Sequence, residues 1–151
     1  MIEQFVTSDN LLAQFAVSTV MVVLCVFVHG LGLFGLNRAV RTETAVERLE
    51  HTNPLSPRGV LFTLAAVIAM LALHGVQIWI FAFTYLALGA IPDLESALYF
   101  STISYSTVGY NDTHVLPEWR LLGAFESVLG IFMLGWSTAF FFRLTGRIDP
   151  H

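Results

Sequence analysis

The sequence contains little charge and no lysine, and both features bear on the class of protein. Charged residues make up 12% of the 151 residues, about half the share of a soluble domain, whereas hydrophobic residues make up 56%. The single cysteine, Cys25, lies inside an apolar run and cannot form an intrachain disulfide, so we interpret it as a small buried hydrophobic residue. These absences exclude a disulfide scaffold and argue against a soluble domain.

The hydrophobic residues are gathered into three long runs, which predict three membrane-spanning helices. Each run reaches the ~20 residues needed to cross a bilayer, and they cover residues 11–36, 59–90 and 121–142. The first run is too long for a signal peptide and has no basic residue before it, so we expect it to be retained. The expected organisation is an extra N-terminal helix (1–36), a cytoplasmic loop (37–58), a membrane domain (59–142) and a cytoplasmic tail (143–151).

The arginines predict how the chain crosses the membrane, because short cytoplasmic loops carry an excess of basic residues. Six of the seven arginines flank the runs on one side, and they are Arg38, Arg41, Arg48, Arg58, Arg143 and Arg147. Only Arg120 lies between the second and third runs. We therefore expect the N-terminus outside, the C-terminus in the cytoplasm, and the segment between the second and third runs on the outer side.

That outer segment begins with a short helix that is expected over residues 94–105. Pro92 and Asp93 are typical of a helix start, since Asp93 can cap free backbone N–H groups and Glu95 suits the positive end of the helix dipole. The helix is too short to cross the membrane. A membrane accepts such a re-entrant segment only where protein or water surrounds it.

The four residues "TVGY" that follow the short helix suit the coordination of a dehydrated cation. Four copies of an extended strand can supply rings of backbone carbonyl oxygens to an ion that leaves water. Directing successive carbonyls at one axis requires some residues to adopt positive φ, which Gly109 does without steric cost. Thr107 can add a hydroxyl oxygen, and we expect the side chains of Val108 and Tyr110 to point away and pack against the short helix.

Residues 97–112, "ALYFSTISYSTVGYND", resemble the pore helix and selectivity filter of the tetrameric potassium channels. The resemblance extends over an outer helix (59–90), a pore helix (94–105), a filter (106–112) and an inner helix (121–142). More specifically, the chain resembles small bacterial ion channels of the two-transmembrane pore type, with one extra N-terminal helix. The resemblance implies a homotetramer in the bacterial inner (plasma) membrane, with K⁺ bound at Thr107, Val108, Gly109 and Tyr110.

The resemblance also implies roles for residues around the filter, with two departures from the family pattern. Asp112 matches the acidic residue just outside the filter, and Tyr99 matches the aromatic residue of the pore helix whose polar edge can bond that acid. Ser106 and Asn111 flank the four ion-binding residues and are expected to support the filter or form its mouth. Asn111 replaces the second filter glycine; because asparagine tolerates left-handed backbone, we expect a cost of about 1 kcal/mol and a less regular outermost ring. Ile103 stands where some members have a buried glutamate.

A partly polar stripe of small or flexible residues follows helical spacing on the third run: Ser127, Gly130, Leu134 and Thr138. We interpret it as lining a water-filled cavity, although such stripes also pack membrane helices together. By the resemblance, Gly130 also falls where the family often has its hinge glycine.

Three ionisable residues lie within the runs, and each is a candidate for gating or pH sensing. His29 and His74 lie on antiparallel helices at similar depth, so we expect them to approach each other. Glu126 lies near the outer end of its helix and is a candidate for supporting the filter from behind. The alternative for all three is that they form hydrogen bonds between helices and have no further role.

The sequence thus predicts an all-α membrane protein with three transmembrane helices, a re-entrant pore helix and a filter loop. The predicted function is passive K⁺ conduction by a homotetramer in a lipid bilayer, with no enzyme activity, no cofactor and no nucleic-acid partner. The alternatives are a weakly selective cation channel, a haem-binding membrane protein that uses His29 and His74 as axial ligands, and a non-conducting accessory subunit.

Overall fold

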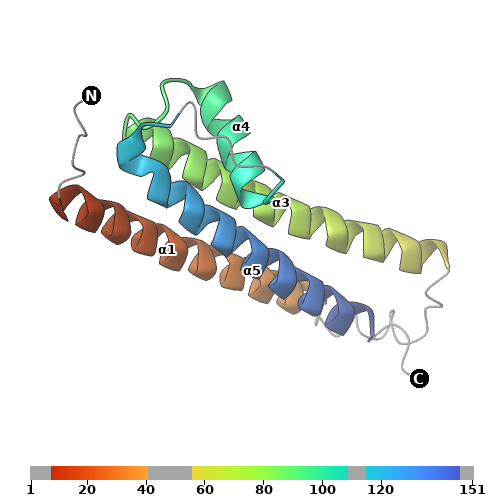
Figure 1. Cartoon of the computed structure of the whole chain (residues 1–151). Helices are drawn as coiled ribbons and strands as arrows, with labels where there is room; N and C mark the ends of the chain where they lie inside the picture. The colour runs from red at the N-terminus through yellow and green to blue at the C-terminus, as the bar shows by residue number, and fades with distance from the viewer. Residues whose placement is uncertain (1–7, 41–55, 109–114, 147–151) are drawn as a thin grey trace. The chain divides into compact units, whose positions relative to one another are not determined.

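All elements in the described part of the chain are helices (Figure 1). The computed structural model describes residues 8–40, 56–108 and 115–146. In chain order the elements are α1 (Ser8–Val40), α3 (Pro57–Ala87), α4 (Leu94–Tyr105), the 3-10 helix η1 (Pro117–Trp119) and α5 (Arg120–Thr145). Three of them, α1, α3 and α5, are long and apolar enough to cross a membrane. The protein is an all-α integral membrane protein, which confirms the predicted fold class.

Local sequence explains where α3 begins and ends. At its start the Ser56 side chain accepts a hydrogen bond from the backbone N–H of Gly59 (3.1 Å), and Pro57 occupies the first helical position, where its missing N–H costs nothing. At its end Gly89 takes a positive φ of 62°, and the N–H of Ala90 donates to the Tyr85 carbonyl (2.9 Å). The helix therefore stops at Ala87, before the end of the apolar run.

The short helix α4 has 12 residues and begins as its sequence predicts. The Asp93 carboxylate accepts a hydrogen bond from the backbone N–H of Ser96 (2.8 Å), which confirms Asp93 as the N-cap. Glu95 lies in the first turn, where the positive end of the helix dipole stabilises its negative charge. After α4 the chain comes back to the end of α3: the N–H of Leu116 donates to the Ala90 carbonyl (3.1 Å), and η1 and α5 follow.

The chain forms two compact units, and each long helix contributes to both. The first, here the α4 unit, contains the described residues 8–26, 76–108 and 115–132. Its core places α4 beside the C-terminal part of α3 and the N-terminal part of α5 (Figure 1). Tyr85 of α3 is fully buried there, with its ring 5.2 Å from that of Phe100 in an edge-to-face arrangement.

The second unit, here the histidine unit, contains the described residues 27–40, 56–75 and 133–146. Val40, Ala66 and Leu144, one from each long helix, form a buried apolar cluster against which Phe62 and Phe140 pack. In the same unit, Gly32 leaves room for Leu73, because a side chain at position 32 would come within 2.5 Å of the Leu73 methyl group. The missing side chain of Gly32 thus lets α1 and α3 approach each other within this unit.

Candidate functional site

The C-terminal end of α4 delivers the chain to the "TVGY" segment in an unusual backbone conformation. Thr107, the first residue of the segment, has a φ of +57° and is the only non-glycine residue with positive φ in the described part of the chain. The N–H of Thr107 donates to the Ser104 carbonyl (3.1 Å), and the Ser106 hydroxyl donates to the Thr102 carbonyl (2.6 Å). This tight turn ends the helix and redirects the backbone at Thr107.

Of the residues expected in and around the filter, some lie outside the described residues: Gly109, Tyr110, Asn111 and Asp112. Val108 is described and is 82% exposed, so within one chain its side chain does not pack against α4, contrary to expectation. Tyr99 is also exposed on α4. The polar partner that the resemblance implies for Tyr99 is Asp112, which is among the residues not described.

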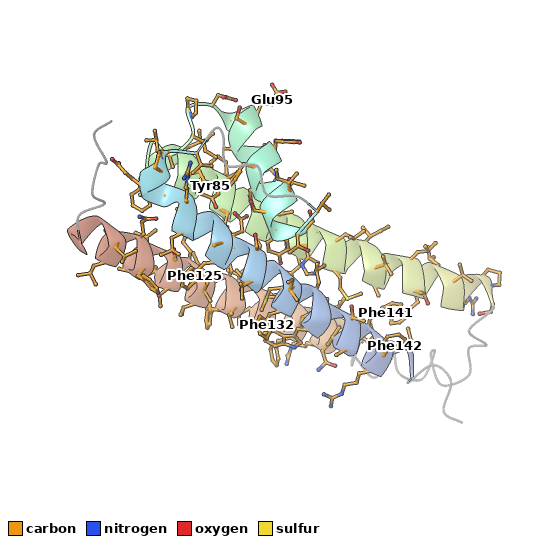
Figure 2. All side chains as sticks on the ribbon, viewed as in Figure 1. Tyr85, Glu95, Phe125, Phe132, Phe141 and Phe142 are labelled. Atoms are coloured by element: carbon orange, nitrogen blue, oxygen red, sulfur yellow. The ribbon has the colours of Figure 1, made fainter. Side chains whose placement is uncertain are left out.

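Behind α4 lies a buried carboxyl group, that of Glu126 on α5. Its side chain has no exposed surface, and the Tyr85 hydroxyl of α3 donates to its Oε2 (2.7 Å). Its Oε1 lies 2.5 Å from the hydroxyl oxygen of Ser101 on α4, which in turn lies 2.9 Å from the Ile78 carbonyl oxygen of α3. One side chain of α5 therefore connects α3 to α4. Figure 2 shows Tyr85 in this region, whereas Glu95 projects from the far end of α4.

Two further contacts fix the C-terminal end of α4 against its neighbours. The buried Tyr105 hydroxyl donates to the side-chain oxygen of Gln77 on α3 (2.9 Å). On the other side, a side chain at Gly130 of α5 would overlap the Tyr105 carbonyl oxygen. The last residue of α4 is thus held by a polar side chain of α3 and by the bare backbone of α5.

The four residues of the predicted pore-lining stripe do not share one environment. Gly130 is buried and lies against the Tyr105 backbone of α4. Ser127 is half-buried and donates to the Gly123 carbonyl of its own helix (3.0 Å). Leu134 and Thr138 are exposed. The pore-lining role of the stripe stays a prediction, and at Gly130 the contact with Tyr105 agrees with the packing alternative.

Within the α4 unit, α1 contacts α5 through side chains that sequence reasoning did not single out. Gln14 is buried, and its side-chain oxygen accepts a hydrogen bond from the backbone N–H of Leu121 (3.2 Å) in the first turn of α5. The rings of Phe15 and Phe125 meet edge to face at 5.5 Å. A polar residue within the first apolar run was a signal for such a role, because it needs a partner inside the membrane.

In the histidine unit, His29 and His74 approach each other as predicted. Their ring centroids are 5.1 Å apart at an interplanar angle of 44°, and both side chains are buried. The His29 Nε2 lies 3.1 Å from the Ser137 hydroxyl of α5, and the His29 ring lies 5.5 Å from that of Trp136. Two axial ligands of a haem face each other across the macrocycle, whereas these rings are in contact. No group of three metal-ligating side chains occurs among the described residues.

Comparison with known proteins assigns the family. The family model described as an ion channel (Ion_trans_2) matches residues 60–147, which is more than half of the chain and includes α4, α5 and nearly all of α3. No curated protein and no solved structure gives a significant match. The matched region contains the short helix, the start of the "TVGY" segment and the buried Glu126 contacts described above. The chain belongs to the ion channel family.

Proposed function

We propose that the protein is a subunit of a potassium-selective channel that conducts K⁺ passively across a lipid bilayer. Four chains around a cyclic axis each contribute one filter strand, Thr107–Tyr110, and their carbonyl oxygens replace the water around the ion. The functional assembly is a homotetramer that needs no cofactor and carries out no enzymatic reaction. The membership of the chain in an ion channel family supports the general function, and the local backbone supports the filter.

The observation that carries the filter proposal is the positive φ of Thr107. A β-branched residue in this conformation is a genuine outlier that costs roughly 1–2 kcal/mol. Such strain persists where the surrounding structure enforces it, and it is concentrated at functional sites. A filter strand needs positive φ at some of its residues to turn successive carbonyls toward one axis. The positive φ of Thr107, the first residue of the strand, supports this proposal.

The position of α4 adds electrostatic support for the filter proposal. Its C-terminal end carries the partial negative charge of the helix dipole, and this end immediately precedes Thr107. A cation at the start of the filter is therefore favoured by the helix that leads into it. The arginine distribution supports an orientation with the filter near the outer face of a bacterial inner membrane and both Arg143 and Arg147 in the cytoplasm.

The test is a flux assay on the purified chain in lipid vesicles, in which K⁺ and Na⁺ fluxes are compared with those of protein-free vesicles. We expect K⁺ flux well above Na⁺ flux, and a higher ratio of the two in Asn111→Gly because glycine restores free left-handed backbone at the outermost ring. Equal fluxes in the natural chain would establish a weakly selective cation channel. No flux of either ion would favour an accessory subunit. A Soret band in the purified protein would reopen the haem interpretation.

A further inference from the structure

The contacts around Glu126 and Ser101 need more hydrogens than an ionised carboxylate would leave available. The Ser101 hydroxyl has one hydrogen and two oxygen neighbours, the Ile78 carbonyl at 2.9 Å and Glu126 Oε1 at 2.5 Å. The carbonyl can only accept a hydrogen bond. If Glu126 were ionised, its Oε1 could also only accept, and the single hydrogen of Ser101 could serve just one of the two contacts.

A protonated Glu126 satisfies every contact. Oε1 then donates to the Ser101 oxygen, and Ser101 passes its own hydrogen to the Ile78 carbonyl. The Tyr85 hydroxyl donates to Oε2, as its 2.7 Å separation indicates. Each of the three contacts contains one hydrogen in this arrangement, and a single chain of donors runs from α5 through α4 to α3.

The surroundings of Glu126 also disfavour a negative charge. The side chain is completely buried, and an unpaired buried carboxylate costs several kcal/mol. The titratable groups that face it are Tyr85 of α3, Tyr105 of α4 and Cys25 of α1, none of which is basic. Among the described residues no arginine forms an ion pair with it.

We propose that Glu126 is uncharged at neutral pH and that, as a hydrogen-bond donor to Ser101, it positions α4 and the filter segment that follows. Ser101 lies one turn before Tyr105, where α4 ends, so a shift at Ser101 moves the backbone that leads into Thr107. Removal of the proton in alkaline solution leaves two acceptors facing one hydrogen and a charge in an apolar site. The effect on conduction rests on the proposed function, whereas the protonation of Glu126 does not.

The protonation is tested by infrared spectroscopy of the reconstituted protein at neutral pH. The spectrum of Glu126→Gln is subtracted from that of the natural chain, and the same subtraction with Glu95→Gln is the matched control, because Glu95 is exposed to solvent. We expect the Glu126 difference to contain the carbonyl stretch of a protonated carboxylic acid and the Glu95 difference to contain the stretches of a carboxylate. A carboxylate signature for Glu126 overturns the proposal.

The positioning role is tested by K⁺ flux as a function of pH in the same two variants and in Glu126→Ala. Glutamine keeps one acceptor and one donor in place, so Glu126→Gln should retain K⁺ flux at neutral pH and lose the decline that the natural chain shows in alkaline solution. Glu95→Gln should keep that decline, and Glu126→Ala should lose most of its flux at every pH. An alkaline decline that persists in Glu126→Gln would overturn the positioning role.

The two tests separate failure of this inference from failure of the proposed function. If the natural chain passes no K⁺, the proposed function is wrong and flux gives no information about Glu126. The infrared measurement still decides whether Glu126 is protonated. Thermal unfolding then replaces flux as the second readout: the unfolding temperature of the natural chain should fall in alkaline solution more than that of Glu126→Gln. Equal falls in the two proteins would contradict a role for the Glu126 proton in holding α4.

Discussion

The carbonyl oxygen of Tyr105 occupies the space where the first side-chain carbon of any other residue at Gly130 would lie. The backbone of α5 therefore approaches the last residue of α4 more closely than a side chain permits. Since Tyr105 immediately precedes the turn into Thr107, the absence of a side chain at Gly130 helps to determine where the "TVGY" segment begins. This packing role is distinct from the hinge role that the resemblance implies for the same residue.

We predict that Gly130→Ala destabilises the protein by about 1–3 kcal/mol, the usual cost of forcing a group into a packed interior. The matched control is Gly135→Ala on the same helix, where a side chain meets nothing within 4 Å. Alanine at Gly135 should be neutral or stabilising by up to about 1 kcal/mol, because it favours the helix. The measurement is thermal unfolding in detergent micelles, and equal effects of the two substitutions would contradict the packing role.

A second prediction concerns the N-terminal helix. Gln14→Leu removes the acceptor for the Leu121 N–H in the first turn of α5, so we expect a loss of about 0.5–2 kcal/mol of stability, as for the loss of a helix cap. Thr19→Ala is the control, since Thr19 is exposed on α1. Unfolding temperatures of the two variants provide the comparison. If Gln14→Leu is as stable as the natural chain, α1 does not cap α5 in this way.

For Thr107→Gly, stability and selectivity should change in different directions. Glycine adopts a φ of +57° without strain, so the free energy of unfolding should stay equal or rise by up to about 1 kcal/mol despite the greater freedom of the unfolded chain. The variant loses the hydroxyl oxygen proposed for the inner end of the filter, so the ratio of K⁺ to Na⁺ flux should fall. A destabilised variant would show that Thr107 is not strained.

Neighbouring hydroxyl residues on α5 allow a paired test in the histidine unit. Ser137 is buried with its hydroxyl 3.1 Å from His29 Nε2, whereas Thr138 is exposed and donates to the Leu134 carbonyl of its own helix (2.8 Å). Ser137→Ala should cost about 0.5–1.5 kcal/mol of stability, and Thr138→Ala should cost nothing measurable. Thr138 is expected to line the pore, so Thr138→Ala should change single-channel conductance while stability stays the same. Equal stability of the two variants would argue against the bond to His29.

The features that the sequence predicted well depend on neighbouring residues in the chain or on simple antiparallel order. The start of α4 follows from Asp93 and Glu95, because helix capping is a local interaction. The approach of His29 and His74 follows from two adjacent antiparallel helices that carry histidines at similar depth. The three spans follow from the length of the apolar runs.

The features that escaped prediction depend on how each helix is rotated about its own axis. The partners of Glu126 lie 41 and 25 residues away in the sequence, and only the packed structure brings Tyr85 and Ser101 to it. Gln14 meets a backbone group 107 residues away. Each span is apolar on all of its faces. The contrast between a polar and an apolar face, which usually indicates how a helix is rotated, is therefore missing.

The hydrogen bond between Ala90 and Leu116 has a consequence for altering the protein. It joins the two ends of the 91–115 segment, so that this segment, which contains α4, is inserted at one point between α3 and α5. A segment whose ends already meet can change in length or sequence at small entropic cost to the rest of the fold. Segments of different sequence can therefore be exchanged between α3 and α5, provided that they keep Ser101 and Tyr105, whose contacts hold α4 against these helices.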